Sequence, residues 1–130
     1  MEKIQHILEC LKEEAAKGTP LIVEGKKDTG TLRQLGIEGR IVTAKTGGKS
    51  RLDVISEIEK SRVREVILLL DFDRRGKEWT RILKEGLEKS KIKPDLTFWN
   101  ELFAVAGKEL KDIEGLAAYM ETLERKVSRA

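Results

Sequence analysis

The chain has 130 residues, of which 39% are hydrophobic and 38% charged, with a formal net charge of +3. This length and apolar share suit a single domain with one core. No run of eighteen apolar residues and no basic-then-apolar N-terminal stretch occurs, so we expect neither a membrane span nor a signal peptide. Cys10 and His6 are each the sole residue of their type, which excludes an internal disulfide and a two-histidine zinc site.

The remaining composition suggests a setting for the protein. A lone cysteine suits a reducing, cytoplasmic location. Lys and Glu are abundant while Asn and Gln are scarce, a bias typical of thermophile proteins. The small basic excess is compatible with an anionic partner without requiring one.

Hydrophobic periodicity, caps and breakers predict helices that alternate with short strands. In the first part of the chain, we expect a helix at 2–17, a strand at 21–23, a helix at 28–35, a strand at 39–44 and a loop at 45–50. A helix capped by Ser50 and a strand at 66–70 should follow. The last part should contain a helix that includes Trp79 and ends near Pro94, a strand at 95–99 and a helix at 113–127.

The strand cores "LIV" and "VILLL" are continuous apolar runs rather than alternating ones. Strands that are covered on both faces have this pattern. We therefore predict an α/β fold, with a four-stranded, mostly parallel sheet flanked by helices. The expected organisation is one domain over 1–130, with a core at about 19–100 and flanking helices at 2–17 and 113–127.

Three carboxylates follow two of the predicted strands. Glu24 ends the first strand, and Asp71 and Asp73 end the third. If the strand order is 2-1-3-4, these strands are neighbours and the three carboxyls converge to within about 8 Å, where ligands of open parallel sheets bind. Such an oxygen-only set suits Mg²⁺, with Mn²⁺ as an alternative. Taken alone, Asp-x-Asp after a strand is more often a turn or a helix cap.

Cations and glycines surround these acids in the sequence. A carboxylate–metal centre ringed by Lys and Arg suits phosphoryl transfer on a polyanion. Each cation could also be only a solvated surface charge, and the aromatic residues, Trp79 among them, are expected in the core or at a sheet edge. The candidate nucleic-acid-binding residues are Lys26, Lys27, Lys49, Arg51, Arg74 and Arg75, and the candidate phosphate turns contain Gly25, Gly47, Gly48 and Gly76.

The segments "IVEGKKD" and "LLLDFDRRG" resemble the Toprim family of topoisomerases, bacterial-type primases, recombination-repair proteins and nucleases. The resemblance implies a Rossmann-like fold. It also implies that Asp71 and Asp73 bind Mg²⁺, that Glu24 is a further ligand or the general acid/base, and that Arg74 and Lys26 contact phosphate. The chain departs from the family pattern at Phe72, where proline is common, and at Lys77, where an acid is common.

Within that family, "VEGKKDTGTL", the "TGG" turn and "DFDRRGKE" are most similar to the small-ribosomal-RNA maturase nucleases. The segment "KDIEGL" (111–116) resembles a C-terminal Glu-containing segment of those enzymes. The chain also resembles small stand-alone Toprim proteins.

Two interpretations of function stay open. The first is a Mg²⁺-dependent nuclease or RNA-maturase-like enzyme, with RNA favoured over DNA as the substrate. The second is a non-catalytic nucleic-acid-binding Toprim module that works with a protein partner or in a ribonucleoprotein complex. A phosphoacceptor signalling domain is disfavoured because that fold places paired acids after its first strand, where this chain has Glu24 alone.

Overall fold

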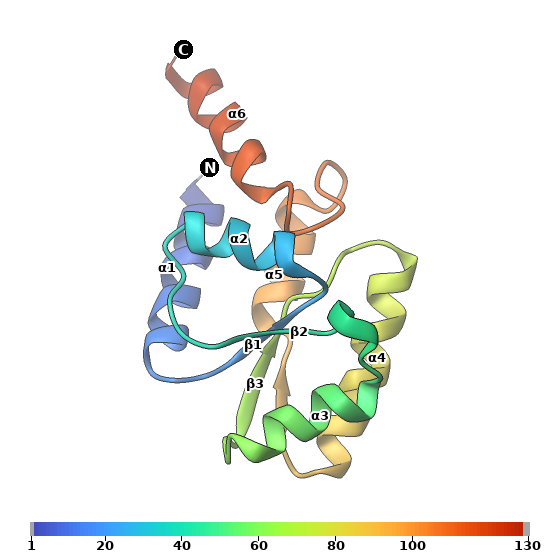
Figure 1. Cartoon of the computed structure of the whole chain (residues 1–130). Coiled ribbons are helices and arrows are strands. Elements are labelled where there is room, and N and C mark those ends of the chain that lie inside the picture. Colours follow the sequence, from blue (N-terminus) through green and yellow to red (C-terminus); the bar gives the residue numbers. More distant parts are fainter. Residues whose placement is uncertain (1, 129–130) are drawn as a thin grey trace.

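The computed structural model describes residues 2–128 (Figure 1). Helices and strands alternate along the chain, as expected for an α/β fold. The strands are β1 (Leu21–Val23), β2 (Ile41–Thr43), β3 (Glu65–Leu68) and β4 (Lys93–Asp95). The helices are α1 (Glu2–Ala16), α2 (Lys26–Gln34), α3 (Arg51–Lys60), α4 (Arg74–Lys89), α5 (Thr97–Ala106) and α6 (Leu116–Ser128), with a short 3-10 turn, η1, at Thr46–Gly48.

The four strands form one sheet in the order β2-β1-β3-β4, and every pair is parallel. This confirms the predicted α/β fold and the adjacency of the first and third strands. Pairing of β1 with β3 extends beyond Leu68, because the Leu69 amide donates to the carbonyl of Ile22 at 2.9 Å. The carboxyl ends of β1 and β3 therefore lie side by side.

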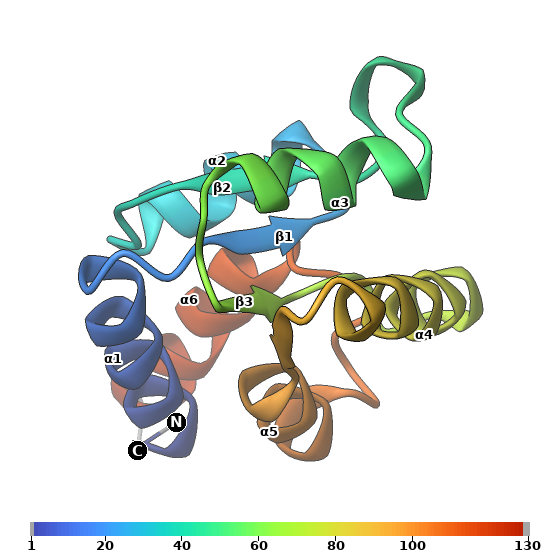
Figure 2. The ribbon, with the colours of Figure 1, turned by 90° about the horizontal axis from the view of Figure 1, so that it is seen from below.

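Successive strand residues point into two separate cores, one on each face of the sheet. Leu21 and Ile67 pack with α1, α2, α5 and α6, whereas Ile22 and Leu68 pack with α3 and α4. Figure 2 shows α3 and α4 on one side of the sheet and α1 and α6 on the other. Burial on both faces explains why the strand sequences are continuous apolar runs. No helix within residues 2–128 is long and apolar enough to cross a membrane.

The fourth strand lies earlier than the sequence suggested. Residues 95–99 were expected as a strand, but β4 is Lys93–Asp95 and Thr97 begins α5. The Asp95 carboxylate accepts a hydrogen bond from the Thr97 amide at 2.9 Å, a turn that directs the chain into a helix. Phe98 and Leu102 are then buried one helical turn apart. The aromatic composition of "TFW" predicted a strand, and the helical spacing of its buried residues prevailed.

The ends of two other helices also differ from the expectation. The helix containing Trp79 ends at Lys89 rather than near Pro94, and Pro94 lies in the edge strand β4, where a missing amide is tolerated. The last helix begins at Leu116, so Ile113 is buried in the preceding loop instead of on the helix. The side chain of Val127, which we expected on the apolar stripe of that helix, lies outside the described part of the structure.

Candidate metal centre

The structure brings Glu24 and Asp71 together at the carboxyl edge of the sheet. Glu24 directly follows β1, and its side chain is only 13% exposed. Burial raises the pKa of Asp71 to about 8, and the neighbouring Glu24 carboxyl adds to this shift, because its oxygens and its negative charge both favour a proton on Asp71. Within the described part of the chain, neither Glu24 Oε1 nor Asp71 Oδ1 has a hydrogen-bond partner, although both atoms are buried.

Two further carboxylates, which the sequence interpretation missed, act on this pair. The charges of Asp28 and Asp112 both raise the pKa of Asp71. Asp28 is itself buried, which raises its own pKa, while its Oδ2 accepts a hydrogen bond from the Gly25 amide at 2.9 Å. Carboxylates from three parts of the chain, residues 24–28, 71 and 112, therefore lie close enough for their charges to raise the pKa values of Asp28 and Asp71.

Asp73 has a local structural role. It is the N-cap of α4, and its Oδ1 accepts a hydrogen bond from the Gly76 amide at 2.8 Å. Its side chain is exposed, unlike that of Glu24. The cap bond leaves the second carboxylate oxygen free to contact a metal, and the assignment of Asp73 as a ligand remains a prediction.

Lys45, which the sequence interpretation also missed, forms an ion pair with Glu24. It follows β2, and its Nζ lies 3.3 Å from Glu24 Oε2. The same ammonium lies 5.5 Å from the centroid of the Trp79 ring. Lys45 therefore offsets part of the negative charge at Glu24 and links the acidic pair to α4.

Phe72 and Lys77, the two residues that depart from the family pattern, both contact the Phe103 ring. Phe72 is buried, with its ring centroid 5.4 Å from that of Trp99 and 5.7 Å from that of Phe103. The Lys77 ammonium lies 4.7 Å from the centroid of the Phe103 ring. Phe72 thus anchors the loop between Asp71 and Asp73 in the core under α1 and α5, and Lys77 covers the exposed side of this cluster.

The segment before α6 closes the acidic centre. The Phe72 amide donates to the carbonyl of Lys111 at 2.7 Å, and the Thr31 hydroxyl donates to the carbonyl of Glu114 at 3.2 Å. These bonds hold residues 111–116 against α2 and the Asp71 loop. The acid that this segment presents to Asp71 is Asp112. Glu114 is half-exposed and lies 3.9 Å from Lys27.

The glycines of the predicted phosphate turns have intramolecular roles. The amides of Gly25 and Gly76 donate to Asp28 and Asp73, so both are already used within the chain. Gly76 also packs directly against the Asp71 backbone, and a Cβ there would overlap the Asp71 carbonyl. Gly47 and Gly48 have φ angles of 73° and 70°, which accounts for glycine in the "TGG" turn by backbone conformation alone.

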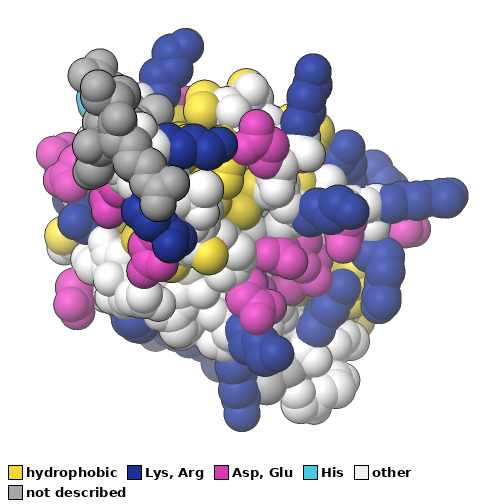
Figure 3. Space-filling view, turned by 90° about the horizontal axis from the view of Figure 1, so that it is seen from above, with side chains coloured by type: hydrophobic (Ala, Val, Ile, Leu, Met, Phe, Trp, Pro, Cys, Tyr) yellow, Lys and Arg dark blue, Asp and Glu magenta, His cyan; other side chains and the backbone are white. Residues whose placement is uncertain are grey.

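The predicted cations divide into exposed and engaged groups. Lys26, Lys27, Arg74 and Arg75 are exposed in the first turns of α2 and α4, where the helix dipole disfavours positive charge. Of these four, Lys27 also pairs with Glu114 at 3.9 Å. Lys49 is engaged instead, because its Nζ lies 2.6 Å from Glu57 Oε1. In Figure 3, acidic side chains gather near the middle of one face with Lys and Arg side chains around them. The helix ends therefore present unfavourable local charge that an anionic ligand would offset.

The residues present fit a divalent cation that completes its coordination with water and phosphate. Glu24 and Asp71 supply hard oxygen ligands, including the two unpartnered buried atoms, which a cation or a proton would satisfy. Among residues 2–128, no group of three or more His, Cys, Asp or Glu side chains forms a ready metal site. Mg²⁺ commonly binds through one or two carboxylates and takes its remaining ligands from water and substrate phosphates.

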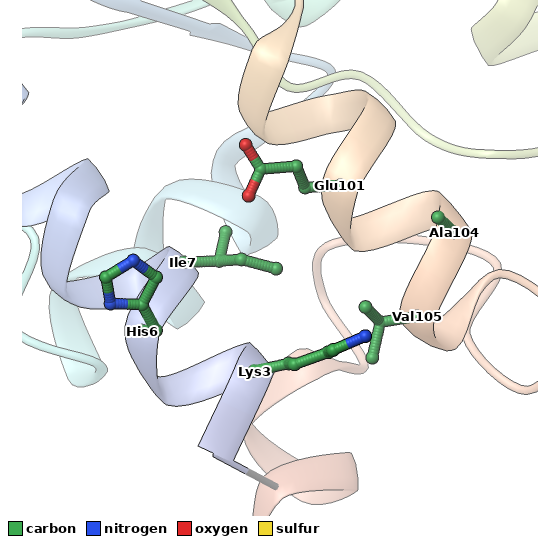
Figure 4. A pocket seen from close by; sticks show the side chains of 6 residues that line it. All are labelled: Lys3, His6, Ile7, Glu101, Ala104 and Val105. Carbon is green, nitrogen blue, oxygen red and sulfur yellow. The ribbon is translucent and has the colours of Figure 1, made fainter.

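A hollow between α1 and α5 lies outside this acidic centre. None of the predicted site residues lines it, and its lining is mostly apolar (Figure 4). Its lining side chains are Lys3, His6 and Ile7 from α1 and Glu101, Ala104 and Val105 from α5.

The site residues that the sequence interpretation missed differ in how strongly the sequence indicates their position. Asp28 stands within "IVEGKKD", and its spacing from Glu24 allows both to lie at the same strand-to-helix turn. Lys45 follows a strand that neighbours β1, so its position at the same sheet edge could have been inferred. Asp112 lies in the segment "KDIEGL", which the motif resemblance singled out for its glutamate, but only packing of this distant segment brings Asp112 near Asp71.

Asp28 and Asp53 provide a matched test of the charge at this centre. Each accepts a hydrogen bond at 2.9 Å from the backbone amide at the start of its helix, α2 or α3. Asp28→Asn removes the charge of this third residue of α2 and keeps an oxygen that can accept the hydrogen bond from the Gly25 amide. It should lower the pKa of Asp71, measured by carboxyl ¹³C NMR titration. Asp53→Asn should leave that pKa unchanged, and equal effects of both variants would contradict the assignment.

Comparisons with known proteins agree with this architecture. Residues 18–97 match the Toprim domain family. The chain is 39% identical to a UPF0292 protein of Methanocaldococcus jannaschii, over 92% of this chain and 91% of that protein. It is 34% identical to a UPF0292 protein of Archaeoglobus fulgidus, over 87% and 86% of the two chains. Both relatives come from thermophilic archaea, as the composition suggested.

A solved structure supports the same assignment. A protein from Aquifex aeolicus is similar with a TM-score of 0.71 and 27% identity, and the match covers 85% of this chain and 94% of that chain. The Glu24 and Asp71 motifs, the all-parallel sheet in the order β2-β1-β3-β4 and the match over residues 18–97 agree with one another. The chain therefore belongs to the Toprim domain family and is related to the small UPF0292 proteins.

Proposed function

We propose that this protein is a Mg²⁺-dependent phosphoryl-transfer protein that acts on nucleic acid, as a nuclease or an RNA-maturase-like enzyme. The observation that carries the proposal is the buried Glu24–Asp71 pair, whose two unpartnered oxygens lie at the sheet edge between helix ends that carry exposed cations. A phosphodiester supplies the anion that these cations lack, and a divalent ion supplies the positive charge that the acids lack.

In this proposal, each side chain at the site has a role that follows from its position. Glu24 and Asp71 would hold Mg²⁺, and Asp73 would reach it through the oxygen that does not cap α4. Bound Mg²⁺ would offset the charge on the phosphate that is attacked. Lys26 and Arg74 would bind flanking phosphates, and Lys45 would keep Glu24 oriented toward Asp71. The motif resemblance favours RNA over DNA as the substrate.

A non-catalytic nucleic-acid-binding module in a larger complex is the second candidate. Two observations favour it: no group of three ligands is preformed in the described residues, and Lys45 already pairs with Glu24. Incubation of the purified protein with labelled structured RNA and DNA panels, in Mg²⁺, Mn²⁺ or chelator, separates the two. Metal-dependent cleavage supports the enzyme, whereas binding without cleavage under every metal condition supports the module.

Salt dependence tests the phosphate contacts of α4. Arg74 is exposed and forms no ion pair with the described residues, whereas Arg81 of the same helix lies 3.2 Å from Glu85. Arg74→Ala should flatten the plot of log K against log salt by about 0.7 to 0.9 and weaken binding to all sequences alike. Arg81→Ala should leave the slope unchanged. An unchanged slope in Arg74→Ala would remove Arg74 from the interface.

A further inference from the structure

A groove lies between the N-terminal turns of α3 and α4. Its volume is about 380 Å³. Its lining includes Lys49, Ser50 and Arg51 at the start of α3 and Arg75, Glu78 and Trp79 of α4. Arg75 lies two residues beyond Asp73, so the groove opens beside the loop that carries the candidate metal ligands.

Trp79 connects this groove to the acidic centre. Part of its ring packs against the core under α3 and α4, and the rest is accessible from the groove. The Lys45 ammonium lies 5.5 Å from its ring centroid and 3.3 Å from Glu24 Oε2. The Lys45 side chain thus connects the Trp79 ring to Glu24, the proposed metal ligand. The sequence led us to expect Trp79 in the core or at a sheet edge, which accounts for only part of this environment.

The charges at the groove favour an anionic ligand. Arg51 and Arg75 are exposed, and neither forms an ion pair with the described residues. Lys49 is neutralised by Glu57, and Glu78 is the one carboxylate in the lining. Both arginines occupy first helical turns, where the helix dipole opposes positive charge. A groove lined by a partly exposed indole and by two guanidinium groups that form no ion pair with the described residues has the composition of a site for a base and its flanking phosphates.

We propose that this groove is a subsite for an unpaired nucleotide, whose base contacts Trp79 and whose phosphates contact Arg51 and Arg75. The inference rests on the proposed function and narrows its substrate class. The nucleic acid must present a single-stranded or flipped-out nucleotide next to the phosphate at the metal centre. A base stacked inside a continuous duplex has no free ring face to offer to Trp79.

Phe103 provides a matched control for Trp79. Both are partly exposed aromatic rings with a lysine ammonium over them, Lys45 in one case and Lys77 in the other. Only Trp79 lines the groove with the two arginines. An effect that depends on the groove should therefore appear on removal of the Trp79 ring and be absent on removal of the Phe103 ring.

The test compares binding of a labelled single strand with binding of a blunt duplex of the same length, by fluorescence anisotropy at low salt in chelator. Trp79→Ala should weaken single-strand binding by about fivefold or more and leave duplex binding unchanged. Trp79→Phe should keep most of the affinity, because phenyl retains a stacking face. Phe103→Ala should change neither affinity.

The outcomes distinguish failure of the nucleotide subsite from failure of the proposed function on which it rests. If the parent binds neither nucleic acid at low salt, the proposed function fails and the subsite fails with it. If the parent binds but Trp79→Ala weakens both substrates equally or neither, only the subsite is overturned. Should Trp79→Ala lose its fold, fluorescence of Trp79 in a Trp99→Phe background decides: quenching by the single strand and not by the duplex supports the subsite, and any other pattern overturns it.

Discussion

Asp71→Asn is expected to abolish Mg²⁺-dependent cleavage while making the metal-free protein more stable. Activity should fall by about 100-fold or more, because groups that merely support metal ligands already contribute about 10- to 100-fold. The free energy of unfolding in chelator should rise by about 1 kcal/mol, since a neutral amide avoids the cost of burying a charge and relieves repulsion from Glu24, Asp28 and Asp112. Cleavage assays and denaturant titrations measure the two effects.

The stability gain should depend on pH. The pKa of Asp71 is about 8 in the folded chain against an ordinary value of 3.8, so the folded state binds more protons than the unfolded state between these values. The parent therefore loses stability as the pH rises through this range, and the advantage of Asp71→Asn should be smaller near about pH 5 than near about pH 8. Cleavage by the variant at the parent's rate would show that Asp71 is not a metal ligand.

Gly76→Ala should be among the most destabilising single-methyl additions in the chain. A Cβ at Gly76 would overlap the backbone carbonyl of Asp71, and neither backbone segment can move alone because Asp73 caps α4 between them. We expect a loss of about 2 to 4 kcal/mol in the free energy of unfolding, in the range of severe overpacking. Because the displaced group is Asp71 itself, Mg²⁺ affinity should fall as well.

Gly30→Ala is the control for this substitution. Gly30 lies inside α2 with nothing within 4 Å of the added Cβ, so alanine should stabilise the protein by about 0.5 to 1 kcal/mol. Chemical denaturation of both variants gives the comparison. If Gly76→Ala were as stable as Gly30→Ala, the close approach of α4 to the Asp71 loop would be wrong.

The local sequence determined which strands carry the candidate metal centre and where they end. The continuous apolar runs "LIV" and "VILLL" identify strands buried on both faces, and alternation with helices makes parallel pairing the natural outcome. Glu24 and Asp71 each follow such a run directly, so adjacency of β1 and β3 places their carboxyls at one edge. These inferences hold because a strand, a helix cap and a turn depend on residues a few positions apart.

The tertiary structure alone decided which other groups join that pair. Asp112 lies near Asp71 because residues 111–116 pack against the Asp71 loop, where the Phe72 amide donates to the Lys111 carbonyl. Lys45 and Trp79 meet although they are 34 positions apart in the sequence. Residues 95–99 illustrate the same limit, since the β-prone aromatics of this segment lie in a helix whose Phe98 and Leu102 are buried in the core with residues of α1 and α6. The physical reason is that burial, charge repulsion and helix packing depend on neighbours distant in sequence, and no local pattern records them.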